Sequence, residues 1–198
     1  EQYLDTLFLH KINFFHFHLT DDQGWRFPVS DWPRIIETGA YRDDLTTDYG
    51  QYGGYYSLAE LSALDAYARD LGITIVPEVD LPGHTSALLA AYPELSCTEE
   101  ARDVPVRWGI FEDVLCTGKE KSFDLVASVL DTLTRTFSGP YIHLGGDETP
   151  TTRWRQCPAC QERLKNEGLS DSGELHGYFM DRAARMVESR GRRPQGSA

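Results

Sequence analysis

The chain has 198 residues, of which 40% are hydrophobic and 25% charged, a composition typical of a folded protein rather than a disordered one. Its net charge of −12 argues against nucleic acid and anionic membrane surfaces as partners. No apolar run is long enough to cross a bilayer, so we expect no membrane partner.

Helical and extended patterns alternate along the chain. Apolar runs predict strands at 12–19, at 73–79 and from Tyr141 onward. Apolar stripes at helical spacing predict helices at about 1–9, 58–71, 122–136, 159–166 and 174–190. Ser57 and Glu60 form a capping box at the start of the second helix. This alternation predicts an α/β fold with βαβ units and a parallel sheet.

Three further stretches lack these patterns. Residues 24–56 and 93–121 are predicted to be loops over one end of the sheet. Residues 194–198 contain no apolar run and are predicted to be a ragged end.

Polar side chains follow each predicted strand at the point where it ends. In a parallel α/β fold the carboxyl ends of the strands meet at one edge, where function gathers. Acids at the C-terminal end of every predicted strand favour a barrel mouth over a single switch-point crevice. The candidates are Asp21 and Asp22 after the first strand, Asp80 and His84 after the second, and Asp147 and Glu148 after the third.

Two kinds of chemistry fit these residues. Paired carboxylates in one pocket are the usual equipment for acid–base chemistry on a glycosidic bond. Alternatively, His16 and His18 share a strand face and could ligate a metal together with Asp80, His84 and His143, as in a metal-dependent amidohydrolase-like barrel. The acids that immediately follow the histidines favour the glycosidase.

The four cysteines are too few for a disulfide scaffold in a chain of this length. Cys157 and Cys160 form a Cys-Pro-Ala-Cys pair, which is half of a structural zinc site. Cys97 and Cys116 could complete that site, and a redox pair is a further alternative. We expect free thiols and no metal.

The motifs together resemble the catalytic domain of glycoside hydrolase family 20, the β-N-acetylhexosaminidases, in its bacterial form. They occur in the family's order, with comparable spacing, over residues 1–193. The matching segments are His16-Phe17-His18-Leu19-Thr20-Asp21-Asp22-Gln23-Gly24-Trp25-Arg26, Gly53-Gly54-Tyr55-Tyr56, Pro77-Glu78-Val79-Asp80-Leu81-Pro82-Gly83-His84 and His143-Leu144-Gly145-Gly146-Asp147-Glu148.

The resemblance implies a TIM-type (β/α)8 barrel that is incomplete in residues 1–198, with strands two to four of the barrel present in a single partial catalytic domain. A complete barrel needs about 250 residues. The family's first strand would precede Glu1 and its later strands would follow Arg193. Open barrel edges predict self-association.

The resemblance also implies hydrolysis of terminal N-acetyl-D-hexosamine from β-linked glycosides, with no cofactor. The substrate's own acetamide oxygen is the nucleophile, so the protein supplies none. Glu148 would be the general acid and then the base, and Asp147 would orient the acetamide. Roles in binding the substrate, or in supporting the residues that touch it, are expected for Asp21, with slight preference over Asp22, and for Asp80, His84, His143 and Trp25. An inactive carbohydrate-binding barrel fragment is the non-enzymatic alternative.

Two tryptophans each have two possible roles. Trp25 and Trp108 could each stack on a sugar ring or pack within the protein, and the sequence favours neither.

Overall fold

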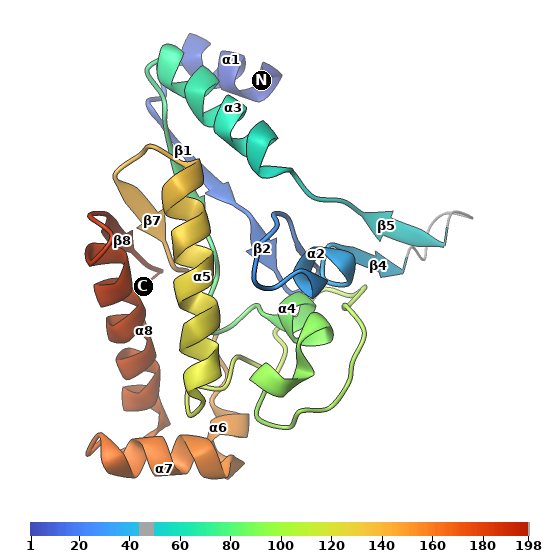
Figure 1. Cartoon of the computed structure of the whole chain (residues 1–198), viewed down its shortest axis with the longest axis vertical. Coiled ribbons are helices and arrows are strands. Elements are labelled where there is room, and N and C mark those ends of the chain that lie inside the picture. Colours follow the sequence, from blue (N-terminus) through green and yellow to red (C-terminus); the bar gives the residue numbers. More distant parts are fainter. Residues whose placement is uncertain (44–49, 198) are drawn as a thin grey trace.

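A four-stranded parallel sheet forms the centre of the computed structural model, which describes residues 1–43 and 50–197 (Figure 1). The strand order is β1-β6-β7-β8. The strands are β1 (Phe14–His18), β6 (Thr74–Glu78), β7 (Tyr141–His143) and β8 (Arg193–Gln195). Two small antiparallel hairpins accompany the sheet: β2 (Thr20–Asp21) with β3 (Gly24–Trp25), and β4 (Tyr41–Asp43) with β5 (Gln51–Gly53).

Helices connect the parallel strands. Figure 1 shows α5 and α8 side by side along one face of the sheet, with α7 across one end of the molecule. The helices are α1 (Gln2–Leu9), α2 (Arg34–Glu37), α3 (Leu58–Asp70), α4 (Ser86–Ala91), α5 (Glu120–Thr136), α6 (Thr152–Gln156), α7 (Pro158–Asn166) and α8 (Ser172–Glu188), with a 3-10 turn η1 (Pro93–Leu95).

The register gives the two faces of the sheet different chemistry. Phe15, Ile75 and Ile142 belong to or pack against the main core on the face that the helices cover. The opposite face carries His16, its register partner Val76, and the other residues at alternate positions of these two strands. This uncovered face, with strands joined by helical connections, is a segment of a (β/α)8 barrel seen from its interior.

Most predicted elements are confirmed with small shifts at their ends. The capping box forms as expected: Ser57 Oγ accepts from Glu60 N at 3.2 Å, and the Glu60 carboxylate accepts from Ser57 N at 2.8 Å. Helix α8 begins at Ser172 rather than at Glu174, because Asp171 caps it by accepting from Gly173 N and Glu174 N.

The prediction of a ragged end at 194–198 is wrong for Pro194 and Gln195, which belong to a fourth parallel strand where the sequence predicted three. Residue 198 lies outside the described residues. Strand β8 has no apolar run because backbone hydrogen bonds to β7 hold it. Arg193 N donates to Pro140 O at 2.7 Å, and Leu144 N donates to Gln195 O at 2.9 Å. Pro194 has no backbone N–H to donate. It fits between these two hydrogen bonds because its backbone nitrogen faces away from β7.

The stretches predicted to be loops contain short elements. Residues 24–56 include α2 and the β4–β5 hairpin, and 44–49 lie outside the described residues. The hairpin is secured by Arg42, whose guanidinium donates to Gln23 O at 2.9 Å and lies over the ring of Tyr52. Residues 93–121 are irregular apart from η1, the single bridge between Ser96 and Leu115, and the first turn of α5.

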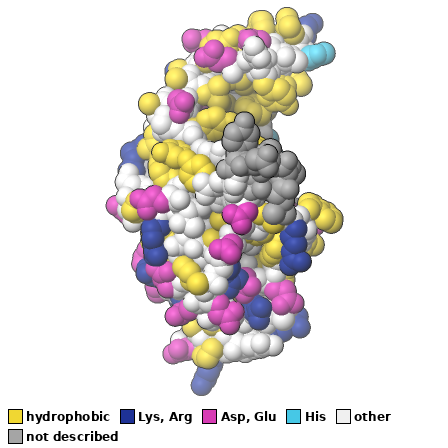
Figure 2. Space-filling model, turned by 90° about the vertical axis from the view of Figure 1, so that its right-hand side faces the viewer, with side chains coloured by type: hydrophobic (Ala, Val, Ile, Leu, Met, Phe, Trp, Pro, Cys, Tyr) yellow, Lys and Arg dark blue, Asp and Glu magenta, His cyan; other side chains and the backbone are white. Residues whose placement is uncertain are grey.

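Hydrophobic side chains are exposed around the N-terminal helix and the edge strand. Figure 2 shows such side chains gathered over the end of the molecule where α1 and α3 lie in Figure 1. They include Tyr3, Phe8, Leu9, Ile12 and Phe14. Among the described residues, no helix combines the length and apolar character that crossing a membrane requires.

Candidate active site

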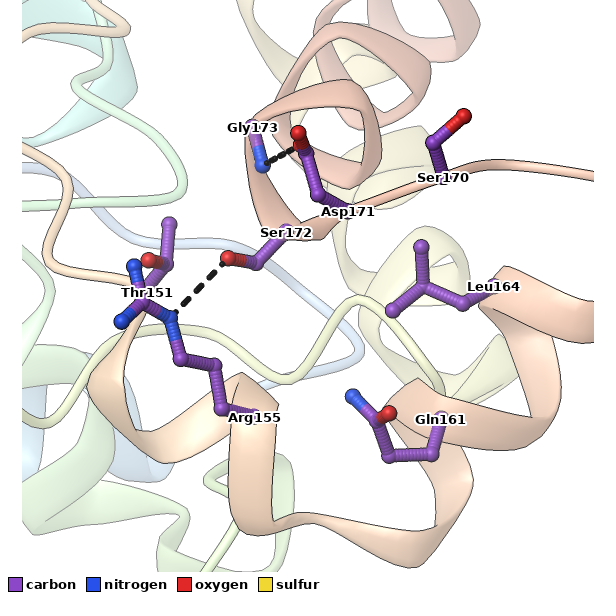
Figure 3. A pocket seen from close by; sticks show the side chains of 8 residues that line it. All are labelled: Thr151, Arg155, Gln161, Leu164, Ser170, Asp171, Ser172 and Gly173. Atoms are coloured by element: carbon purple, nitrogen blue, oxygen red, sulfur yellow. Dashed lines mark hydrogen bonds between the residues drawn. The ribbon is translucent and has the colours of Figure 1, made fainter.

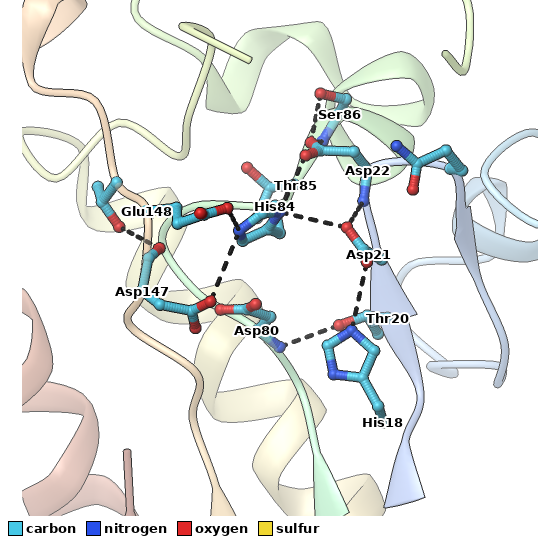
Figure 4. A network of polar contacts seen from close by, with 12 residues as sticks. His18, Thr20, Asp21, Asp22, Asp80, His84, Thr85, Ser86, Asp147 and Glu148 are labelled. Atoms are coloured by element: carbon cyan, nitrogen blue, oxygen red, sulfur yellow. Dashed lines mark hydrogen bonds and ion pairs between the residues drawn. The ribbon is translucent and has the colours of Figure 1, made fainter. Parts of the chain in front are cut away.

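The acids predicted from the three strands meet at the carboxyl end of the sheet. Figure 4 shows His84 at the centre of the group, with Asp21 and Asp22 on one side and Asp147 and Glu148 on the other. The parallel arrangement of β1, β6 and β7 brings the segments that follow these strands together, because the polypeptide leaves all three strands at the same edge of the sheet.

His84 connects the two pairs of acids. Its Nδ1 lies 3.2 Å from Asp21 Oδ1 and 3.1 Å from Asp22 Oδ2. Its Nε2 lies 3.5 Å from Glu148 Oε2 and 3.8 Å from Asp147 Oδ2. Hydrogen bonds to Asp21 and Asp22 raise the pKa of His84 to about 11, so the imidazole is a cation at neutral pH. The slight preference for Asp21 is not supported, since both aspartates contact the ring.

Asp22 is fixed more firmly than Asp21. Its side chain is 2% exposed, and Oδ1 accepts from Ser86 N at 3.0 Å at the start of α4. Asp21 is half-exposed and its Oδ1 accepts from Asp22 N at 2.6 Å. Burial raises the pKa of Asp21, but hydrogen bonds with His18 and His84 outweigh this and lower it. Both aspartates are therefore set to hold the His84 imidazolium.

Asp80 lies beneath the loop that carries the acid pair. Its Oδ1 accepts from Gly146 N at 3.1 Å, and its own backbone N donates to Thr20 Oγ1 at 3.0 Å. Burial, with the nearby charge of Asp147, raises the pKa of Asp80 to about 7. Gly145 makes this approach possible: a Cβ there would lie 1.8 Å from Asp80 Oδ1.

A second polar cluster lies deeper, on the uncovered face of the sheet. The buried carboxylate of Glu78 is contacted by His16 Nε2 and His18 Nδ1, each at 2.6 Å, and by His143 Nδ1 at 3.1 Å. Hydrogen bonds to Asp21 and Glu78 raise the pKa of His18 to about 10. His143 Nδ1 also accepts from Gly145 N at 3.1 Å, which places it at the base of the loop that carries Asp147 and Glu148.

Glu78 was missed as a site residue by the sequence analysis. The available signal was an acid inside an otherwise apolar strand, because such a residue needs a partner when it is buried. The i, i+2 spacing of His16 and His18 does place them on one face, as predicted, and their ring nitrogens contact this carboxylate.

The structure separates the two tryptophans. Trp25 is 2% exposed, packs against Phe27 and donates from Nε1 to Phe27 O at 2.8 Å. Its indole packs within the protein and is not accessible to a sugar, so the predicted substrate-binding role of Trp25 is not supported. Trp108 is 97% exposed. Its neighbour Arg107 is tied to the β2–β3 turn by Gln23, whose Nε2 donates to Arg107 O at 3.2 Å. Trp108 therefore lies close to the segment that carries Asp21 and Asp22.

Cavities occur both near the acids and far from them. One of about 390 Å³ lies beside the site, between His18, Arg26 and the Gly53-Gly54-Tyr55-Tyr56 segment. Another of about 490 Å³ lies between α6, α7 and the start of α8 (Figure 3). Arg155 donates to Ser172 across it at 3.3 Å, but it contains none of the site acids.

The arrangement suits acid–base chemistry on a neutral substrate. Glu148 is 54% exposed at the strand end, and Asp147 beside it is also accessible. A fixed cation, His84, lies within 4 Å of both carboxylates, and buried Asp22 with half-exposed Asp21 holds that cation in place. Both carboxylates come from adjacent positions in one loop, which is a poor arrangement for flanking a bond from opposite sides as a separate acid and nucleophile do.

Comparisons with known proteins agree with the motifs. The model of the glycosyl hydrolase family 20 catalytic domain matches residues 1–196. A β-hexosaminidase from Porphyromonas gingivalis is 39% identical over 193 residues, which cover 98% of this chain. A crystal structure of a β-N-acetylhexosaminidase matches the whole chain with a TM-score of 0.95 and 35% identity. A GH20 exo-β-N-acetylglucosaminidase from Vibrio harveyi, in complex with N-acetylglucosamine, matches 98% of it with a TM-score of 0.87 and 33% identity.

The chain spans only part of each of these proteins. It covers 25% of the Porphyromonas gingivalis protein, 42% of the first crystal structure and 32% of the Vibrio harveyi chain.

Proposed function

Because this chain belongs to the catalytic domain of glycosyl hydrolase family 20, we propose that it supplies the acid–base residues of a β-N-acetylhexosaminidase. The substrate is a glycan or glycoconjugate that ends in a β-linked N-acetylglucosamine or N-acetylgalactosamine. The proposed reaction is retaining hydrolysis in which the substrate's acetamide oxygen attacks the anomeric carbon and the protein supplies no nucleophile.

Glu148 first donates a proton to the leaving oxygen and then removes one from the attacking water. Asp147 accepts a hydrogen bond from the acetamide N–H, which orients the carbonyl oxygen toward the anomeric carbon. The negative charge of Asp147 also stabilises the positive charge that develops as the oxazolinium ring forms. The two adjacent acids thus have different roles on one side of the sugar.

His84, Asp22, Asp21 and Asp80 are positioning residues in this proposal. The observation that carries it is the continuous chain of contacts from buried Asp22 through the His84 imidazolium to Glu148, with 3.1 and 3.5 Å separations. A buried and hydrogen-bonded support of this kind fixes the orientation of an otherwise exposed acid. His143 supports the same loop from below through Gly145 N.

The metal-dependent amidohydrolase-like alternative has less support. The family match is to a glycoside hydrolase, and three of the four histidines that would ligate the metal each contact the Glu78 carboxylate: His16, His18 and His143. The inactive carbohydrate-binding alternative is decided by the experiment that follows.

The test uses the full-length protein with an aryl N-acetyl-β-glucosaminide and, alongside, the corresponding aryl β-glucoside. We expect hydrolysis of the first substrate only. Glu148→Gln should lower kcat by about 10²–10⁴-fold, the usual contribution of a general acid. The matched control is Glu167→Gln, which removes an exposed carboxylate after α7 and should leave kcat unchanged.

Each departure has a distinct meaning. Equal hydrolysis of the plain glucoside would contradict assistance by the acetamide. Unchanged kcat in Glu148→Gln would contradict the role of that residue. Binding of N-acetylglucosamine without any turnover would support the carbohydrate-binding alternative.

A further inference from the structure

All four cysteines of the chain converge, although they are far apart in sequence. Cys97 follows η1, Cys116 precedes α5, Cys157 is the N-cap of α7 and Cys160 lies in its first turn. The Sγ–Sγ distances are 3.7 Å for Cys97–Cys160, 3.7 Å for Cys116–Cys157 and 3.5 Å for Cys116–Cys160. All four Sγ atoms lie within 4.8 Å of one another, and none is in a disulfide.

These distances match a tetrahedral thiolate site. With zinc–sulfur bonds of about 2.3 Å, the sulfurs of a tetrahedron lie about 3.8 Å apart. A disulfide would require about 2.0 Å. Cys116 and Cys160 are fully buried and Cys157 is nearly so, which separates the sulfurs from the solvent. The two cysteines of one Cys-Pro-Ala-Cys turn, together with two from elsewhere, are a common ligand set for structural zinc.

We propose that Cys97, Cys116, Cys157 and Cys160 bind one zinc ion in a closed structural site. Four protein ligands leave no open coordination position, so the ion would not take part in the hydrolysis. The inference is independent of the proposed function, because the four sulfurs are absent from the chain of contacts around His84.

The backbone around the cysteines is already packed for such a site. A Cβ at Gly118 would lie 2.2 Å from the carbonyl carbon of Ala159, so the segment after Cys116 presses directly on the first turn of α7. Lys119 Nζ donates to Glu94 O and Ser96 O, each at 2.8 Å, and so ties the segment before Cys97 to the one after Cys116.

The site would hold an irregular segment onto the helices. Residues between Cys97 and Cys116 contain little regular structure, and Arg102 and Arg153 both pair with Asp113 there. Around the thiols lies a small separate core that includes Val114, Trp154, Leu164 and Leu175. Because such a core buries little apolar surface, a bound metal ion can supply the stability that a larger core would give. Exposed Trp108 lies in the same segment, so zinc would also fix its position.

The test is elemental analysis of the full-length protein after purification without metal-chelating resin. We expect about one zinc ion per chain. Cys116→Ser and Cys160→Ser should each lose most of it. Thr117→Val is the matched control. Thr117 lies between Cys116 and Gly118 in the sequence, and its buried hydroxyl has no hydrogen-bond partner among the described residues, so zinc should be retained.

A second measurement on the unmodified protein covers the case in which the serine variants do not fold. Titration with a mercurial that modifies thiols, in the presence of a coloured zinc indicator, should release one zinc ion as four thiols react. Chelation of the zinc should lower the apparent melting temperature.

Several results would overturn the proposal. Metal-free protein with four free thiols would do so, as would two disulfides, which mass spectrometry reveals as a loss of four hydrogens. Retention of the metal by both serine variants would place it elsewhere, for example among the histidines and acids near Glu78. One iron per chain instead of zinc would overturn the assignment of the ion.

Discussion

Nε2 of His84 lies 3.5 Å from Oε2 of Glu148, and both residues hold a left-handed backbone, with φ of 49° and 43°. Such values are uncommon for residues other than glycine and cost about 1–3 kcal/mol each. The unfavourable backbone at both ends of one contact is consistent with a geometry that serves function. The contact also links the acid to the buried Asp22, which lies 3.1 Å from the other ring nitrogen.

His84→Gln in the full-length protein should lower kcat/KM by about 10–10²-fold, because the support of Glu148 is lost and Asp22 is left buried without its cation. The pKa of His84 is raised to about 11, so the variant removes a positive charge at neutral pH. The charge on the wild-type ring is lost as the pH rises toward about 11, so the His84→Gln pH–rate profile should lack the fall in rate that accompanies this loss.

The control for this change is His10→Gln, at the exposed end of α1. It should leave both the rate and the profile unchanged. A His84→Gln profile of unaltered shape, at reduced amplitude, would mean that His84 acts only through the fold.

The positions of the site acids were predictable from the sequence because they depend on simple features. Apolar runs of strand length ended in acids, and parallel strands bring such ends to one edge. Helix boundaries near Ser57 and Gly72 followed from local capping chemistry.

Features that depend on distant contacts were not predictable in this way. Strand β8 is defined by backbone hydrogen bonds to β7, which leave no apolar pattern. Glu78 acquires its histidines only when β1 and β7 flank β6. The cysteines meet only after the chain from η1 to α7 has folded, and long separations hide such a ligand set in the sequence.

The isolated chain of 198 residues should self-associate. Strand β1 is an edge of the sheet, with Phe14 exposed and in edge contact with Tyr141. Exposed apolar edges pair readily with other chains. Sedimentation velocity should show concentration-dependent association that Phe14→Lys reduces. Ile110→Lys, a matched change at an exposed site in the 93–121 segment, should not reduce it. A monomer with a sharp two-state melt would contradict this expectation.

Trp108→Ala should weaken binding of longer substrates. The indole is almost fully exposed, and the bond from Gln23 to Arg107 O holds its segment near the site. Stacking on a sugar beyond the cleaved bond would be worth about 0.5–1.5 kcal/mol, so KM for an N-acetylglucosamine oligosaccharide should rise about 2–10-fold. KM for a small methyl glycoside should not change. Ile110→Ala is the control, and an equal rise on both substrates would contradict stacking beyond the cleaved bond.

Gly145→Ala should displace the loop that carries Asp147 and Glu148. The residue has φ +68°, and a Cβ would overlap the Asp80 carboxylate, which accepts from Gly146 N. The loop must move to relieve this overlap, and a displacement of about 1 Å can reduce catalysis about 10²-fold.

Gly72→Ala separates the steric effect from the backbone effect. Gly72 follows α3 with φ +73°, and a Cβ there would meet no atom within 4 Å. Both variants incur the cost of a left-handed alanine, about 1 kcal/mol or more, and should lower the melting temperature. Only Gly145→Ala should also lower kcat when each protein is assayed well below its own melting temperature. Equal kcat in the two variants would show that the contact between Gly145 and Asp80 does not position the acid pair.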